Sequence, residues 1–384
     1  MIARDPVELA QRLVRRPSVA PLDAGAMGDL EAALAGLGFA CSRWIGDPAS
    51  EAPADLLYAR MGSGSPHLCF GGHIDVAPVG DEDAWTAPPF RADIIDDMLY
   101  GRGAADMKGA IAAFLSAVSR LVLTGGVGEG SLSVLITGGG WCENGPGADM
   151  ARDRLDTLGV RFDHAIIGSA AGVETAADSV VAGRCGVILA DLTVDAAHHL
   201  TGTESESAST ALARLLNALL SEPLDGGAEK FPPSALGLVA INADAAGWSL
   251  QPAIANARLT AFYNPRWTAE TLTTFLERRL RAAAEGLTSD WRFEVRPLSA
   301  PFVCEDPVWL DFAAEAVAAA TGAAPERRYG GAPASAALFA GLCPIAEIGL
   351  PGGLSHRVDE RVSASDIRKL TDVYDEILKR YFRR

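Results

Sequence analysis

The chain alternates apolar segments of strand length with longer amphipathic helices, and this alternation constrains its fold more than any other feature. In the first half, buried-strand patterns cover His67–Phe70 and Ser131–Ile136, with a helix pattern over Asp106–Leu121 between them. A further strand is expected over Ala165–Ile167. Since strands that alternate with helices form a mainly parallel sheet covered on both faces, we predict an α/β fold.

The pattern changes after Cys185, where the order becomes strand, helix, strand, strand, helix, strand. This order is that of a β-α-β-β-α-β unit. A helix, a strand and a last helix then return to the first pattern. We therefore predict a small domain, residues 183–297, inserted between the two parts of a larger catalytic-type domain, residues 1–182 and 298–384.

Length, charge and cysteine content limit the possible functions. The chain has 384 residues, with 33 Lys+Arg against 49 Asp+Glu and a formal net charge of −16. Such a length favours two domains over one. The negative charge repels phosphate backbones and anionic headgroups, so we expect no nucleic-acid partner and no membrane partner. The six cysteines form no CxxC pair, which argues against a disulfide framework.

The opening segment, residues 1–19, lacks the continuous apolar core of a secretory signal. No stretch of the chain is apolar over the roughly 18 residues that span a bilayer. We therefore expect a cytoplasmic protein.

The first segment that can carry chemistry is Gly71-Gly-His-Ile-Asp-Val, directly after a buried strand. His73 and Asp75 are two positions apart, so on an extended backbone their side chains point the same way. A metal-bound imidazole usually donates its second ring N–H to a carboxylate, and an Asp on the same face could accept it, which suits this pair to a metal site. A strand-end histidine satisfied by its neighbour explains the motif equally well.

The second segment, Tyr100–Gly109, runs through a glycine-rich turn into a helix, with Asp106 where an N-cap is expected. A capping role and a functional role for this carboxylate both stay open at this point. The glycines match neither the dinucleotide-binding pattern nor the P-loop, which excludes a nucleotide site of either kind.

Together with Asp81–Phe90 and Ser355–Val362, these segments resemble the di-zinc aminoacylase and desuccinylase family of metallopeptidases, and within it the desuccinylase branch. The resemblance spans essentially the whole chain. It implies a zinc-exopeptidase-like α/β/α catalytic domain with an inserted ferredoxin-like lid domain, through which the family dimerises. It also implies two zinc ions and hydrolysis of N-acyl amino acids.

The resemblance assigns roles to five residues that this chain retains. His73 and His356 match the histidines that each hold one zinc, and Asp106 matches the carboxylate that bridges the two ions. Asp75 matches the residue that orients the first histidine. Arg184 matches an arginine that anchors the substrate.

Three carboxylates of the family pattern are missing. Counted without gaps, the general base falls on Gly140, one zinc ligand on Trp141 and another on Ser169. A local shift would place Glu143 at the base position and still leave the ligand absent. The lid histidine that reaches the partner's site has its nearest counterpart in His199, one position away.

Because a catalytic zinc takes three protein ligands and keeps an open position, we expect no metal or one weakly bound divalent ion, zinc before others. We therefore expect a non-hydrolytic homodimer with a binding or assembly role. The alternative is an active metallohydrolase, or a remodelled enzyme, that acts on an N-acylated amino acid or small peptide. It would use one metal or a site built from Cys142, Glu143 and a histidine. In either case, Trp141 is expected to fill the vacated space.

Overall fold

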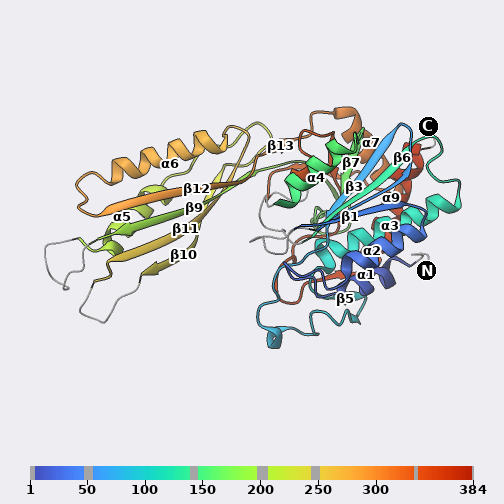
Figure 1. The fold of residues 1–384 in the computed structure, drawn as a ribbon, viewed down its shortest axis with the longest axis horizontal. Coiled ribbons are helices and arrows are strands. Elements are labelled where there is room, and N and C mark those ends of the chain that lie inside the picture. The colour runs from blue at the N-terminus through green and yellow to red at the C-terminus, as the bar shows by residue number, and fades with distance from the viewer. Residues whose placement is uncertain are drawn as a thin grey trace. The chain divides into compact units, whose positions relative to one another are not determined.

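The structure is a computed structural model that describes residues 5–46, 55–138, 146–196, 206–243, 251–332 and 336–382. The chain divides into two compact units (Figure 1). Unit 1 comprises Met1–Ala182, Cys304–Arg328 and Ala334–Arg384, and unit 2 comprises Gly183–Val303 and Tyr329–Pro333.

The second crossing between the units lies at Val303, six positions beyond the residue 297 predicted from the sequence. The reason is that Pro297 lies within strand β12 (Asp290–Ser299), which is paired along its length with the sheet of unit 2. The metal-binding role expected for unit 1 and the dimerising role expected for unit 2 stay predictions.

Unit 1 is built on a mixed sheet with the strand order β1-β2-β6-β3-β7-β15-β8, and β14 pairs with β8. The last two residues of β8, Gly183 and Arg184, belong to unit 2, and there they pair with β13. The strands β3, β6, β7 and β15 run parallel to their neighbours in this group, which confirms the parallel core of the α/β prediction. The bounds of the strands are β1 (Ala40–Ile45), β2 (Asp55–Gly62), β3 (His67–His73), β6 (Ser131–Gly138), β7 (His164–Ile167), β8 (Ser179–Arg184), β13 (Phe302–Val303), β14 (Glu326–Tyr329) and β15 (Ile345–Glu347).

Helices pack against this sheet and against one another. Their bounds are α1 (Pro6–Val14), α2 (Ala26–Gly36), α3 (Gly109–Leu123), α4 (Pro146–Thr157), α7 (Pro307–Thr321), α8 (Ala336–Phe339) and α9 (Ala364–Phe382). Helix α3 packs against both α1 and α9 and is buried along most of its length, because its many alanines let the other helices approach closely. At its centre, Phe114 stacks on Phe70 of β3 with ring centroids 4.0 Å apart, and Tyr374 of α9 contacts both rings edge-on.

A second, three-stranded sheet joins two segments that are far apart in the chain. Its order is β16 (Arg361–Ser363), β5 (Met98–Tyr100) and β4 (Ile94–Ile95). The pairing of β5 with β16 is antiparallel and places Tyr100 opposite Arg361. The glycine-rich turn that follows β5 and the loop that precedes β16 are therefore held side by side.

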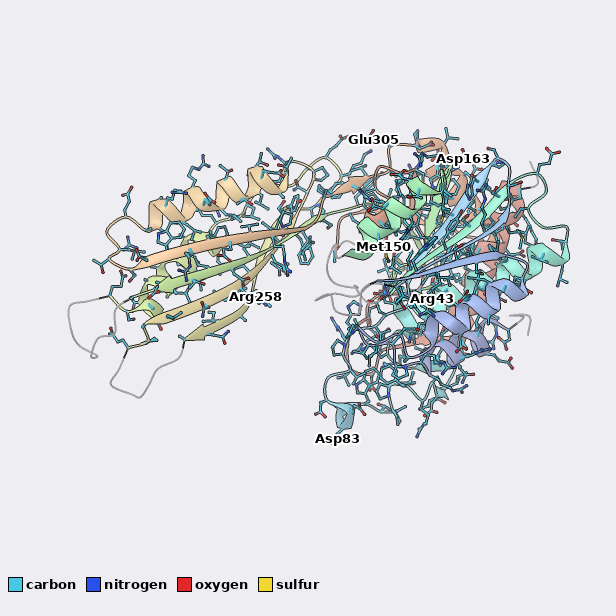
Figure 2. All side chains as sticks on the ribbon, viewed as in Figure 1. Arg43, Asp83, Met150, Asp163, Arg258 and Glu305 are labelled. Atoms are coloured by element: carbon cyan, nitrogen blue, oxygen red, sulfur yellow. The ribbon has the colours of Figure 1, made fainter. Side chains whose placement is uncertain are left out.

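Unit 2 is an antiparallel sheet in the order β10-β11-β9-β12 with two helices on one face, which confirms the predicted β-α-β-β-α-β order. Its elements are β9 (Gly186–Asp195), α5 (Ala208–Leu220), β10 (Ala235–Ala243), β11 (Ile254–Tyr263), α6 (Ala269–Ala283) and β12 (Asp290–Ser299). Side chains of the opposite face are exposed; there Arg258 of β11 pairs with Asp191 of β9 at 2.8 Å (Figure 2).

In the described part of the chain, no helix is both long and apolar enough to cross a membrane.

Candidate metal and active site

The candidate site begins at the carboxyl end of β3, whose last residue is His73. Open α/β sheets place their sites at this edge, because the carboxyl ends of parallel strands meet there. The Nδ1 atom of His73 lies 2.9 Å from the main-chain oxygen of Asp75, whereas the Asp75 carboxylate lies 3.8 Å away. A carbonyl oxygen can only accept, so the proton is on Nδ1. His73 is therefore oriented by the main chain of Asp75 at hydrogen-bond distance, and its Nε2 atom is turned towards Asp106.

Asp106 lies in the turn η2 (Ala104–Lys108), before helix α3. The helix begins at Gly109 with Lys108 as its N-cap and no side-chain capping bond, so the capping role considered for Asp106 is wrong. Instead, the Asp106 carboxylate lies between two imidazoles. Its Oδ1 atom is 3.6 Å from Nε2 of His73, and its Oδ2 atom is 3.0 Å from Nε2 of His356.

The charges of this cluster are strongly coupled. Burial by itself raises the pKa of Asp106, but the hydrogen bonds and charges of His356 and His73 outweigh it and hold that pKa well below its usual range. For His73, burial lowers the pKa, and the contacts with Asp106 and Asp75 outweigh it, so the net shift is upward. The carboxylate therefore stays ionised between the rings.

His356 comes from the loop between β15 and β16 and has a left-handed backbone with φ of 65°. Its side chain is 38% exposed, whereas those of His73 and Asp106 are 8% and 13% exposed. One histidine therefore closes the cluster from the solvent side, and the other supports it from the sheet.

The donor set fits a divalent ion in its chemistry but is not an assembled metal site. Imidazole nitrogen and carboxylate oxygen are the ligands that zinc prefers, and the three side chains of His73, Asp106 and His356 supply both. Each oxygen of Asp106 faces a different imidazole, so the carboxylate lies against both histidines. Among the residues that the structure describes, no group of three or more His, Cys, Asp or Glu side chains is already arranged around an ion position.

Ser169 follows strand β7 and is buried, and its hydroxyl donates a short hydrogen bond to Oε2 of Glu347. Glu347 is the last residue of β15 and is fully buried. The acid that lies against the expected ligand position therefore comes from a neighbouring strand. Reasoning from the sequence missed it, although an acidic residue inside the apolar run Ile345-Ala-Glu-Ile was a usable signal.

The remaining predicted residues lie in unit 2 or outside the described residues. Arg184, at the end of β8, belongs to unit 2, where its Nη1 atom lies 3.5 Å from the main-chain oxygen of Gly330. The other predicted positions lie outside the described residues: Gly140, Trp141, Cys142, Glu143 and His199.

Comparisons with known proteins decide the family. The sequence profile described as peptidase family M20/M25/M40 matches residues 69–380. The chain belongs to this family. It is 40% identical over 385 residues to the succinyl-diaminopimelate desuccinylase of Rhodopseudomonas palustris strain HaA2, covering 98% of this chain and 99% of that protein. It is 38% identical over 387 residues to the enzyme of the same name from Rhodospirillum centenum, and the match covers 99% of this chain and 98% of that protein.

Two solved structures illustrate the shared fold. The metallo-carboxypeptidase Sso-CP2 of Sulfolobus solfataricus has a TM-score of 0.81 and 17% identity, with 99% of this chain and 100% of that chain covered. The di-peptidase Dug1p of Saccharomyces cerevisiae has a TM-score of 0.81 and 15% identity, with 99% and 96% covered.

Family membership confirms the resemblance to metallopeptidases and desuccinylases. The expectation of a non-hydrolytic protein is not supported, because the relatives near 40% identity carry the name of an enzyme. The comparisons favour the alternative of an active hydrolase instead.

A glutamate at position 169 should make the stability of this M20 protein depend on zinc. In Ser169→Glu, a second carboxylate would face buried Glu347, so without metal the free energy of unfolding should fall by about 1–3 kcal/mol. Added zinc should reverse the loss. An ion that binds only the folded chain raises the free energy of unfolding by about 2.7 kcal/mol when its free concentration is 100 times its Kd. Thermal unfolding with and without zinc measures both effects.

Ser179→Glu is the matched control, because Ser179 is also a buried serine but donates to the main-chain oxygen of Ala171. It should lose stability without any rescue by zinc. If zinc raises the unfolding temperature of Ser169→Glu no more than that of the parent chain, the assignment of Ser169 to a ligand position is wrong.

Proposed function

We propose that this chain is an amidohydrolase of the M20 family that acts on an N-acylated amino acid or small peptide with one divalent ion per chain. The observation that carries the proposal is the Asp106 carboxylate placed between His73 and His356 at the sheet edge. The relatives named succinyl-diaminopimelate desuccinylase favour an N-succinyl amino acid as the substrate.

In this proposal His73, Asp106 and His356 hold the ion. When bound, the ion supplies Lewis-acid polarisation of the acyl carbonyl. The contact of His73 with the Asp75 main chain keeps its proton on Nδ1 and presents Nε2 to the site. Glu143, after a local shift in register, is proposed to take the proton of the attacking water.

We also propose that the chain forms a homodimer through unit 2. Supporting this, the edge strand β10 exposes apolar side chains: Leu238 is 41%, Val239 60% and Ile241 54% exposed. An exposed edge with apolar side chains tends to pair with another chain. Sedimentation equilibrium that gives the mass of a single chain would contradict this part of the proposal.

One observation favours a second candidate, a protein that binds the acylated ligand without hydrolysing it. The Ser169 position offers a hydroxyl already bonded to Glu347, where the family pattern has a ligand carboxylate. Fewer ligands lower the affinity for the ion and with it the rate of any metal-assisted step.

A hydrolysis assay separates the two candidates. With N-succinyl and N-acetyl amino acids, the parent chain should show turnover that a chelator abolishes and added zinc restores. Glu143→Gln should reduce that turnover by about 10²–10⁴-fold while zinc uptake is kept, because it removes only the base. Stabilisation by these ligands without turnover under any metal would refute the hydrolase and support the second candidate.

A further inference from the structure

A buried ion pair joins the two segments that carry Asp106 and His356. Nη1 of Arg102 is 2.7 Å from Oε2 of Glu360, and the two side chains are 2% and 0% exposed. Arg102 lies in the glycine-rich turn after β5, and Glu360 precedes β16. Burying two charges is costly unless the pair is well placed and its remaining hydrogen-bond groups are satisfied. The other contacts of Glu360 therefore show which segments of the chain the pair stabilises.

The Glu360 carboxylate contacts the main chains of both segments that form the site. Its Oε1 atom accepts from the main-chain N–H of Ala105 at 3.1 Å and of Asp106 at 3.3 Å. Its Oε2 atom accepts from the N–H of His356 at 3.3 Å, in addition to Arg102. One carboxylate thus ties together the backbones of the two residues whose side chains meet at 3.0 Å.

Arg102 is itself fixed from several sides. Nη1 also donates to the main-chain oxygen of Arg357 at 3.1 Å, and Nη2 donates to that of Pro78 at 3.0 Å. The guanidinium lies 5.2 Å from the ring centroid of Trp85, within cation–π range. A planar donor group held in this way fixes the direction of its partner carboxylate more strictly than a lysine would.

The main chain reinforces the same connection. The main-chain oxygen of Glu360 accepts from the N–H of Gly101 at 2.9 Å, immediately beyond the pairing of β5 with β16. The loop of His356 therefore has its C-terminal end anchored to the turn that carries Asp106, by both the main chain and the side chain of one residue.

We propose that Glu360, anchored by Arg102, is a positioning residue that holds Asp106 and His356 at the separation the site needs. It does not touch the reacting groups; it acts on their backbones. The claim that this separation serves ion binding rests on the proposed function. The contacts of Glu360 that hold the two backbones do not depend on it.

The test uses two variants of the full chain. Glu360→Asp keeps the charge but shortens the side chain, so it cannot reach Arg102 and the three N–H groups together. The double variant Arg102→Met with Glu360→Gln removes both charges at once, which leaves no unpaired buried charge if the first variant folds poorly. Each should weaken zinc affinity by about 10–100-fold in a chelator competition titration, the range for residues that orient ligands.

Hydrogen exchange provides the second readout and needs no metal. In both variants the amides of Asp106 and His356 should lose protection together. Asp29→Asn is the matched control, because Asp29 is a mostly buried carboxylate whose ion pairs are with Arg12 and Arg16, not with Arg102 or the main chains of Asp106 and His356. It should leave zinc affinity and both amides unchanged.

The outcomes separate the two claims. If the parent chain takes up no ion, the proposed function fails, and joint deprotection of the two amides alone decides the positioning role. If both variants keep the parent's protection of these two amides against hydrogen exchange, the proposal is wrong. It is also wrong if the amides lose protection but zinc affinity stays equal to that of the parent chain.

Discussion

Asp106→Asn should reduce the zinc affinity of the chain by about two orders of magnitude or more. The carboxylate contacts both imidazoles, one through each oxygen, and its charge stays ionised in a nearly buried position. An asparagine has one acceptor oxygen and no charge, so it cannot serve both histidines or offset the charge of an ion. A chelator competition titration on the purified variant measures the change.

Asp75→Asn is the control for this variant. Its side chain lies 3.8 Å from His73, but the contact at hydrogen-bond distance comes from its main chain, which the substitution preserves. Zinc affinity should therefore fall by about tenfold at most. Equal losses in the two variants would show that Asp106 has no special place in the site.

Phe114→Ala should lower the free energy of unfolding of unit 1 by about 3–5 kcal/mol, the range for removal of a buried phenylalanine. The ring is 0% exposed and packs between Phe70 and Tyr374, with centroids 4.0 and 5.5 Å away. Truncation leaves a cavity between β3, α3 and α9, and tightly packed neighbours fill it only in part. Denaturant unfolding measures the loss as a lower midpoint.

Phe262→Ala in unit 2 is the control, because that ring is 37% exposed on β11. A substitution at such a position should change stability by about 0.5 kcal/mol or less. If Phe114→Ala unfolds at the parent midpoint, the packing of α3 on the sheet is not the core of unit 1.

The sequence predicts best those elements that are buried on both faces. Strands β3 and β6 are buried along nearly their whole length, because helices cover both sides of the parallel sheet, and the apolar segments Leu68–Phe70 and Val134–Ile136 indicate them in the sequence. Strand β1 was missed because it is a half-exposed edge strand with Ser42 and Arg43 at its centre. Strand β8 was also missed, although its first five residues are buried.

For the site, the family resemblance implied that His73, Asp106 and His356 act together, and the structure places the Asp106 carboxylate 3.6 Å from His73 and 3.0 Å from His356. What the sequence could not give is the environment of an acidic residue. Glu360 stands beside Asp359 in the chain, yet Glu360 is fully buried, whereas Asp359 binds Thr86 in an exposed loop. Only the folded turn that brings Arg102 to Glu360 separates their roles.

The most direct test of the proposed one-ion hydrolase is the zinc content of the purified chain after dialysis, measured together with its turnover of N-succinyl amino acids. The proposal predicts one ion per chain, with both the ion and the turnover lost in Asp106→Asn. Two tightly held ions per chain, or turnover that survives complete removal of metal, would contradict it.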